Sequence, residues 1–212
     1  MRTFVRRMAN SIDKYGVSFR DDGKTLFRCP QNFRGDYIIP EGTISIASNA
    51  FGSCTELTSV VIPASVEYIG DGAFNRCSEL KSVVILTEHL NEIASSCFRY
   101  CSQLREIHIP LGIKKIGSYA FSFSGLSSIV LPETVSDIEY GAFYLCENLS
   151  FVQFPNHPLN ISQFAFHGCA KLDGNISQIT GKEHIMNGCR LPQSRGKKRT
   201  KGTITDADMT YF

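Results

Sequence analysis

The chain has 212 residues, of which 42% are hydrophobic and 20% charged, so it can build a folded core and is not globally disordered. No apolar run approaches the ~20 residues of a membrane-spanning helix, and none follows the N-terminal arginines as in a secretory signal. The net charge is +5 over residues 1–35, −7 over residues 36–174 and +4 over residues 175–212. The acidic body has the wrong sign for a nucleic-acid-binding domain.

The first predicted element is a β-hairpin in residues 15–26. Its turn is Asp22-Gly23, a dipeptide that strongly favours a tight hairpin connection. Several apolar residues around it can cover the open end of the structure that follows: Val17, Phe19, Leu26 and Phe33. Residues 1–35 are therefore predicted to form an N-terminal cap.

Residues 36–174 contain six copies of a unit of about 23 residues. Each copy carries an Ala-Phe or Cys-Phe pair, with the phenylalanines at positions 51, 74, 98, 121, 143 and 166. A Cys follows three residues later in five of the six copies, and an Ile lies five residues before every Phe. A unit this short cannot bury its own apolar face, so the copies must stack and cover one another.

The spacing within one unit predicts the path of each turn. The segment L-x-x-(V/I)-x-(I/L) reads as a short strand with alternate side chains inward, and the Pro after it ends the strand because it has no N–H to donate. The following V-x-x-I returns as a second short strand or a 3₁₀ turn, and a tight helical turn then places Phe in the interior. We expect a right-handed solenoid with one parallel sheet along a face and a column of stacked Phe rings.

The repeat C-x-x-L-x-x-(V/I)-x-(I/L)-P-x-x-V-x-x-I-x-x-x-A-F-x-x-C resembles the BspA-like leucine-rich repeats, a class common in bacterial surface proteins and some protozoa. The resemblance covers residues 36–174, and residues 15–26 also resemble the hairpin that often precedes such arrays. It implies a leucine-rich repeat superhelix that acts as a non-enzymatic protein-binding scaffold, used by many relatives for adhesion. Without an encoded export signal the chain is expected in the cytoplasm, or at the cell surface if it is part of a longer protein.

The repeat decays at the C-terminus. Residues 185–189 echo the A-F-x-x-C pattern, so residues 175–191 are predicted to form a degenerate last turn that caps the array. Residues 192–212 are predicted to be a flexible basic tail. The stretch from Arg190 to Lys201 holds six positive charges and no acid, which offers an alternative function, binding to nucleic acid or another acidic surface.

The cysteines and histidines do not form a chemical site in the sequence. Six of the eight cysteines occupy interior repeat positions, where Cys acts as a small hydrophobic residue, so we predict reduced and buried thiols. Cys29 and Cys189 lie near the ends and could be exposed. No C-x-x-C occurs, and no His recurs beside a carboxylate or nucleophile. No catalytic residue, metal or cofactor is predicted, and the chain is not expected to be an enzyme.

The outward positions of the predicted strands form two rows. One row is mostly small and polar and includes Glu106 and Phe151, and the other is mostly β-branched. The second row is an apolar stripe suited to a protein or peptide partner, or it reflects only the strand preference of Val and Ile. Glu106 and His108 interrupt the Ser and Val pattern, so they are the expected specificity residues. The candidate binding residues are Val61, Val84, Glu106, His108, Val130, Phe151 and Gln153.

Overall fold

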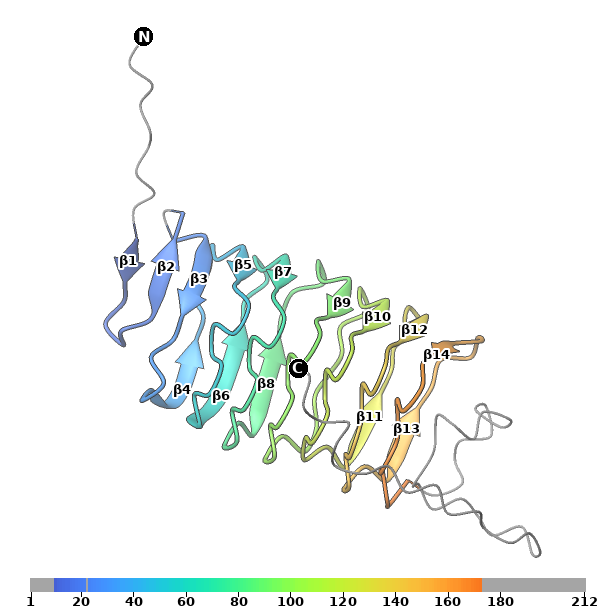
Figure 1. Cartoon of the computed structure of the whole chain (residues 1–212). Coiled ribbons are helices and arrows are strands. Elements are labelled where there is room, and N and C mark those ends of the chain that lie inside the picture. The colour runs from blue at the N-terminus through green and yellow to red at the C-terminus, as the bar shows by residue number, and fades with distance from the viewer. Residues whose placement is uncertain (1–9, 22, 173–212) are drawn as a thin grey trace, which may run out of the picture.

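The structure, a computed structural model, describes residues 10–21 and 23–172 as an elongated stack of similar turns (Figure 1). Strands of successive turns pair in parallel, and the predicted repeat solenoid is confirmed. The predicted cap of residues 175–191 and basic tail of residues 192–212 lie outside the described residues.

The stack begins with three antiparallel strands, β1 (Ser11–Ile12), β2 (Ser18–Arg20) and β3 (Thr25–Arg28). β2 and β3 are joined through Gly23, which has a φ of 89° and supplies the left-handed conformation that the turn needs. β3 then pairs in parallel with β5 (Ser45–Ile46), so the hairpin continues directly into the first solenoid turn.

Five of the six described turns begin with a strand on one face of the stack. These strands are β4 (Arg34–Ile38), β6 (Glu56–Ile62), β8 (Ser82–Ile85), β11 (Ser128–Val130) and β13 (Phe151–Gln153). They form a three-stranded sheet, β4-β6-β8, and a separate two-stranded sheet, β11-β13. We call this side of the molecule the strand face. The expected single sheet is therefore divided in two.

The returning V-x-x-I segments form a second set of very short strands. They are β5, β7 (Tyr68–Ile69), β9 (Glu92–Ile93), β10 (Lys115–Ile116), β12 (Asp137–Ile138) and β14 (Asn160–Ile161). β5 and β7 extend the N-terminal hairpin sheet, whereas β9, β10, β12 and β14 form their own sheet. Their inward Ile side chains close the other side of the core.

The segment around each repeat Phe is a chain of tight turns, and no helix is present among the described residues. In the Phe74 turn, the N–H groups of Gly72, Phe74 and Arg76 donate to carbonyls of the next turn at N···O distances of 2.8 to 2.9 Å. The alternate N–H groups donate to the residue three positions earlier in the same turn. This alternation requires left-handed backbone two residues before and after the Phe, with φ of 63° at Gly72 and 64° at Arg76. A continuous helix would bond only within itself and could not link successive turns.

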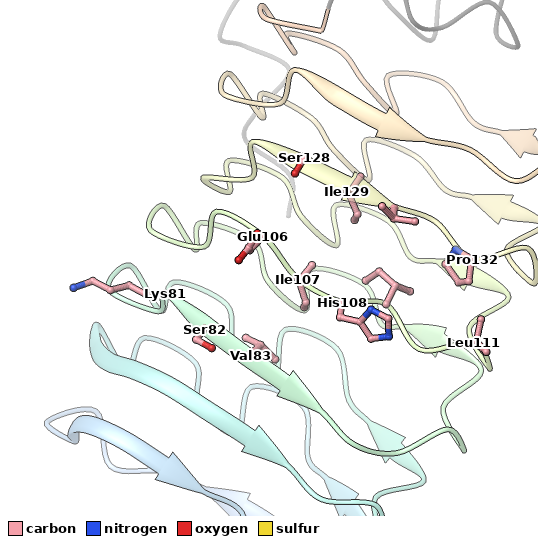
Figure 2. A pocket seen from close by; sticks show the side chains of 12 residues that line it. Lys81, Ser82, Val83, Glu106, Ile107, His108, Leu111, Ser128, Ile129 and Pro132 are labelled. Atoms are coloured by element: carbon pink, nitrogen blue, oxygen red, sulfur yellow. The ribbon is translucent and has the colours of Figure 1, made fainter.

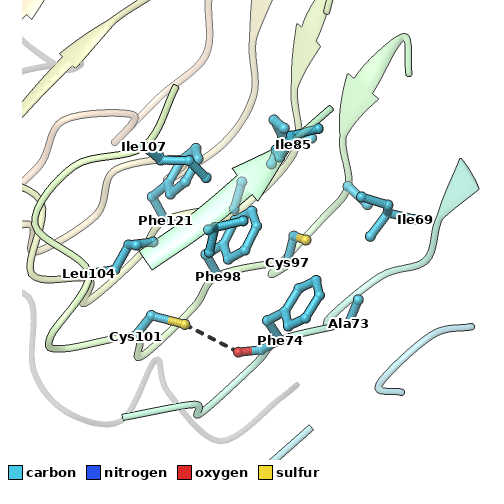
Figure 3. Close-up of a cluster of buried hydrophobic side chains, with 14 of the residues drawn as sticks. Ile69, Ala73, Phe74, Ile85, Cys97, Phe98, Cys101, Leu104, Ile107 and Phe121 are labelled. Atoms are coloured by element: carbon cyan, nitrogen blue, oxygen red, sulfur yellow. Dashed lines mark hydrogen bonds between the residues drawn. The ribbon is translucent and has the colours of Figure 1, made fainter. Parts of the chain in front are cut away.

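The six repeat phenylalanines form the centre of the core. All six are fully buried, which confirms the prediction for Phe74, Phe98, Phe121 and Phe143. Successive rings lie 4.9 to 5.5 Å apart between centroids and within 14° of parallel, as the close-up of the central turns shows (Figure 3). This spacing is close to the ~4.8 Å between neighbouring strands of a sheet, so the stacked backbone sets the ring separation.

The repeat cysteines are buried free thiols, as predicted. The Cys101 thiol donates to the carbonyl oxygen of Phe74 in the preceding turn at 3.2 Å (Figure 3), and Cys77 and Cys146 make the same contact with their preceding turns at 3.1 and 3.0 Å. These three thiols therefore point at backbone oxygens rather than at one another. Cys29, which could have been exposed according to the sequence, is also buried.

Replacing Phe98 with Ala is expected to lower the free energy of unfolding by about 3–5 kcal/mol, because it leaves a cavity between two stacked rings. Urea unfolding followed by circular dichroism measures the loss. Val84→Ala, on a half-exposed side chain, serves as the control and should lower it much less. Similar losses for the two variants would show that the column contributes little.

Native thiol titration should detect at most one fast-reacting cysteine. Seven of the eight cysteines are buried, and Cys189 lies outside the described residues. Burial raises the pKa of the Cys146 thiol to about 12 and also raises the pKa of the Cys77 and Cys101 thiols, which suppresses the reactive thiolate. The remaining thiols should react once guanidinium unfolds the protein. Three or more fast thiols in the native protein would contradict the buried arrangement.

Candidate functional site

The outward residues of the strand face lie in the two rows expected from the sequence. Val61 of β6 is the ladder partner of Val84 of β8, and Val130 of β11 is the partner of Gln153 of β13. Phe151 pairs with Ser128 in the other row. These residues therefore share one surface of the solenoid.

The strand face exposes a line of large apolar side chains. Val84 is 42% exposed, Val130 53% and Phe151 41%, whereas Val61 is less exposed than these three. Glu106, His108 and Gln153 are exposed. Three further exposed apolar residues, which the sequence analysis did not include in the candidate site, are Ile38, Leu86 and Leu111.

The polar groups at the N-terminal end of the strand face satisfy one another. The Asp36 carboxylate accepts hydrogen bonds from Ser59 Oγ at 2.6 Å and Thr58 Oγ1 at 2.7 Å, and these bonds lower the pKa of Asp36. Arg34 forms an ion pair with Glu56 at 3.2 Å. In contrast, Glu106 and His108 are not engaged by any side chain in the described part of the chain, so both keep their hydrogen-bonding capacity.

The parallel ladder is interrupted at residues 106–109. In regular turns the inward residue at the strand end bonds to the next turn, as Ile39 N–H does to Val61 O at 3.1 Å and Leu131 N–H to Gln153 O at 2.9 Å. The equivalent bonds from Ile85 and Ile109 are missing within the described residues. The segment carrying Glu106 and His108 consequently lies unpaired between the two sheets (Figure 1).

One cause of the interruption is an extra residue in the turn before it. Eight positions separate Ile85 from Ile93, whereas seven separate the equivalent residues of the other turns, such as Ile62 and Ile69. The extra length is fixed by the buried Thr87, whose hydroxyl donates to Val66 O at 2.6 Å and accepts from the His89 N–H at 3.1 Å. The short-strand sheet is divided at the same place, between β7 and β9.

The turn after the interruption is one residue short. Five positions separate Phe121 from Leu126, whereas six separate the equivalent pair in every other turn. Gly125 allows the shortcut, because its backbone approaches Ser102 so closely that a Cβ there would lie 2.1 Å from the Ser102 carbonyl oxygen. The unpaired segment thus lies between one turn that is too long and one that is too short, which moves its backbone groups out of register with both neighbours.

A groove of about 530 Å³ opens on the strand face at this interruption. Figure 2 shows Glu106 and His108 on the unpaired segment, with Lys81 and Ser82 on one side and Ser128 on the other. Aliphatic side chains line the rest of the groove: Val83, Ile107, Ile109, Leu111, Ile129 and Val130. The volume lies within the ~300–1,000 Å³ typical of ligand sites, and the mostly apolar lining with a few polar groups is typical of a recognition surface.

The groove offers groups suited to recognition of a partner. Its lining combines one carboxylate, one imidazole and one ammonium group with unpaired backbone N–H and C=O groups. No group of three or more His, Cys, Asp or Glu residues within the described ranges could hold a metal ion. The same ranges contain no helix long and apolar enough to cross a membrane. The groove can therefore supply apolar contacts, charge pairing and backbone hydrogen bonds.

Stacked 23-residue turns, with parallel strands on one face and a buried Phe column, define a leucine-rich repeat protein. Residues 24–149 and 114–189 match the family described as BspA type leucine rich repeat region, in six copies. The chain belongs to this family. No curated protein matches the chain.

Several solved structures have the same fold. A leucine-rich repeat protein from Bacteroides ovatus ATCC 8483 is 27% identical with a TM-score of 0.64, covering 81% of this chain and 46% of its own. A leucine rich cell surface protein from Faecalibacterium prausnitzii A2-165 is 30% identical with a TM-score of 0.60, covering 72% and 39%. The T. pallidum leucine rich repeat protein is 22% identical with a TM-score of 0.58, covering 90% and 98%. The chain thus spans less than half the length of the first two proteins.

Amide hydrogen exchange tests the interruption directly. The Ile85 and Ile109 amides, which lack the inter-turn bond, should exchange faster than those of Ile39 and Leu131, which have it. All four side chains are buried, so the comparison isolates the hydrogen bond. Equal protection at the four amides would mean that the sheet is continuous and that the groove is not open.

Proposed function

We propose that the chain is a non-enzymatic protein-binding module that holds a segment of a partner protein on its strand face. The observation that carries the proposal is the groove at residues 106–109, which lies at the centre of the exposed apolar line. Leucine-rich repeat folds commonly mediate protein–protein interactions. The partner is expected to place an apolar side chain into the groove and to pair polar groups with Glu106 and His108.

The energetics support a partner of this kind. The strand face is built on stacked, hydrogen-bonded turns, so little conformational entropy is lost there when a partner binds. Val84 and Val130 flank the groove and offer apolar area, His108 lies between them, and Glu106 and Lys81 add polar groups beside them. An apolar centre with a polar rim is the usual arrangement of a protein interface.

Adhesion is the setting we propose for this binding. One of the similar structures is described as a cell surface protein, and a second structure with the same fold, at 17% identity and a TM-score of 0.62, is the pneumococcal vaccine antigen PcpA. The alternative function, binding of nucleic acid through the stretch from Arg190 to Lys201, concerns residues outside the described ranges. The net charge of −7 over residues 36–174 would oppose a polyanion beside the body.

The double variant Val84→Glu/Val130→Glu should abolish capture of the partner. Both side chains are about half exposed, so the free energy of unfolding should change by only about 0.5 kcal/mol per site, whereas buried carboxylates would disrupt an apolar interface. The full chain is immobilised, proteins that it retains from a cell lysate are identified, and the same capture is repeated with the variant.

The matched control is Ile12→Glu/Tyr68→Glu, which places two charges on similarly exposed apolar residues away from the strand face. It should retain the captured protein. Unimpaired capture by the strand-face variant would refute the proposed site, and equal loss in both variants would show that charge alone prevents binding.

A further inference from the structure

A second surface lies on the side of the molecule formed by the Phe turns. Two positions in each turn, two residues before and two after the buried Phe, have left-handed backbone. In the C-terminal half, bulky side chains occupy several of these positions, with φ of 54° to 61°: Tyr100, Tyr119, Phe123, Leu145 and Phe164. Left-handed backbone is costly for a bulky residue and natural for Gly or Asn.

The same positions elsewhere show that the fold does not need bulky residues there. Gly72, Gly141 and Gly168 occupy three of them, and Asn49 and Ser53 occupy both positions of the Phe51 turn. Each of these turns keeps a buried Phe, and the Phe51, Phe74 and Phe143 turns share the same alternating hydrogen bonds. Aromatic side chains at these costly positions occur only from Tyr100 to Phe164 among the described repeat turns, which points to a function for that region.

The rings form one continuous surface. Tyr100 stacks on Phe123 with centroids 4.7 Å apart, and Phe123 meets Tyr144 edge-on at 5.8 Å. A second row, in which Tyr119, Tyr140 and Phe164 meet edge-on at 5.5 Å, joins the first through Tyr119 and Tyr144 at 6.3 Å. We define the aromatic turn surface as Tyr100, Tyr119, Phe123, Tyr140, Tyr144 and Phe164. Tyr140 is 41% exposed and the other rings are half-buried.

Two arginines lie at the N-terminal end of this surface. The Arg76 and Arg99 guanidinium carbons lie 5.2 and 4.9 Å from the Tyr100 ring centroid, and that of Arg99 also lies 5.1 Å from the Tyr119 centroid. Arg99 Nη2 donates to Tyr100 Oη at 3.4 Å. Within residues 10–21 and 23–172, neither arginine forms an ion pair with a carboxylate. Two neighbouring cations therefore keep most of their hydrogen-bond donors unused.

We propose that the aromatic turn surface, with Arg76 and Arg99, binds an acidic peptide segment of a partner protein. The two guanidinium groups pair with carboxylates of the segment, and the Tyr and Phe rings contact an apolar side chain beside those carboxylates. Arg and Tyr are the residue types enriched in the energetic centres of protein interfaces. The inference goes beyond the proposed function, because it concerns a different side of the molecule.

Charge complementarity selects a short acidic peptide. The arginine pair matches two carboxylates in space, and Arg–carboxylate hydrogen bonds are strong and directional. A long polyanion such as nucleic acid would have to run beyond this pair along a body whose net charge is −7 over residues 36–174. Such a ligand would be repelled outside the pair, whereas a peptide of a few residues would not.

Fluorescence anisotropy with a labelled Glu-Phe-Glu-Phe-Glu peptide and the full chain tests the proposal. The peptide should bind saturably, and a Gln-Phe-Gln-Phe-Gln peptide should bind at least about tenfold more weakly, because charged hydrogen bonds are lost. Arg76→Gln/Arg99→Gln should weaken binding of the acidic peptide to a similar degree. Phe123→Asn, which suits left-handed backbone, should also weaken it while the protein stays folded by circular dichroism.

The matched controls are Ser53→Asn, at the position equivalent to Phe123 in a turn without surface rings, and Arg34→Gln on the strand face. Both should bind the acidic peptide as the unchanged protein does, as should Val84→Glu/Val130→Glu, which separates this surface from the groove. If Phe123→Asn unfolds, the arginine variant decides. Equal binding of the Glu and Gln peptides, undiminished binding by the arginine variant, or tighter binding of a labelled single-stranded DNA than of the peptide would overturn the proposal.

Discussion

The structure depends on the hydrogen bonds that link each Phe turn to the next. Alternate N–H groups leave the turn along the stacking axis, so every turn must lie directly on its neighbour at the separation of paired backbones. Equivalent side chains of neighbouring turns are therefore stacked. This holds for the Phe rings of the core, for the thiols that donate to carbonyl groups, and for the rings of the outer surface. A single backbone pattern thus generates the core and both candidate binding surfaces.

The same constraint explains where the molecule opens. The Phe-turn ladder continues without a break from Phe74 through Phe98 to Phe121, so a turn of irregular length cannot be accommodated on that side. One turn has an extra residue at Thr87, and a later turn lacks a residue at Gly125. The change in length is accommodated on the strand face, where residues 106–109 lose their hydrogen bonds to the neighbouring strands. The resulting groove places unpaired backbone groups, Glu106 and His108 at the centre of an otherwise continuous apolar line.

Much of the fold could be predicted because the repeat period and the strand alternation determine which residues meet. The buried Phe column, the inward thiols and the two outward rows all follow from position within the repeat. The left-handed residues could not be predicted, since Tyr100 and Phe123 stand where the strongest sequence signal would be Gly or Asn.

The groove was not predicted, although the sequence contains its signal. Ile93 follows Ile85 by eight positions instead of seven, and Leu126 follows Phe121 by five positions instead of six. Glu106 and His108 were selected only because they differ from their Ser and Val neighbours. Their position in the groove comes from the irregular turns on either side.

If the strand face binds its partner where the ladder is open, closing the ladder should abolish binding. In one variant, a residue is removed between Leu86 and Asn91 and another is added between Phe123 and Leu126, which restores the regular length of both turns without changing any candidate binding residue. Capture of the partner by this variant is the decisive measurement. We expect this variant to fold, to protect the Ile85 and Ile109 amides from exchange, and no longer to retain the partner. A folded variant with a continuous ladder and undiminished capture would contradict this expectation.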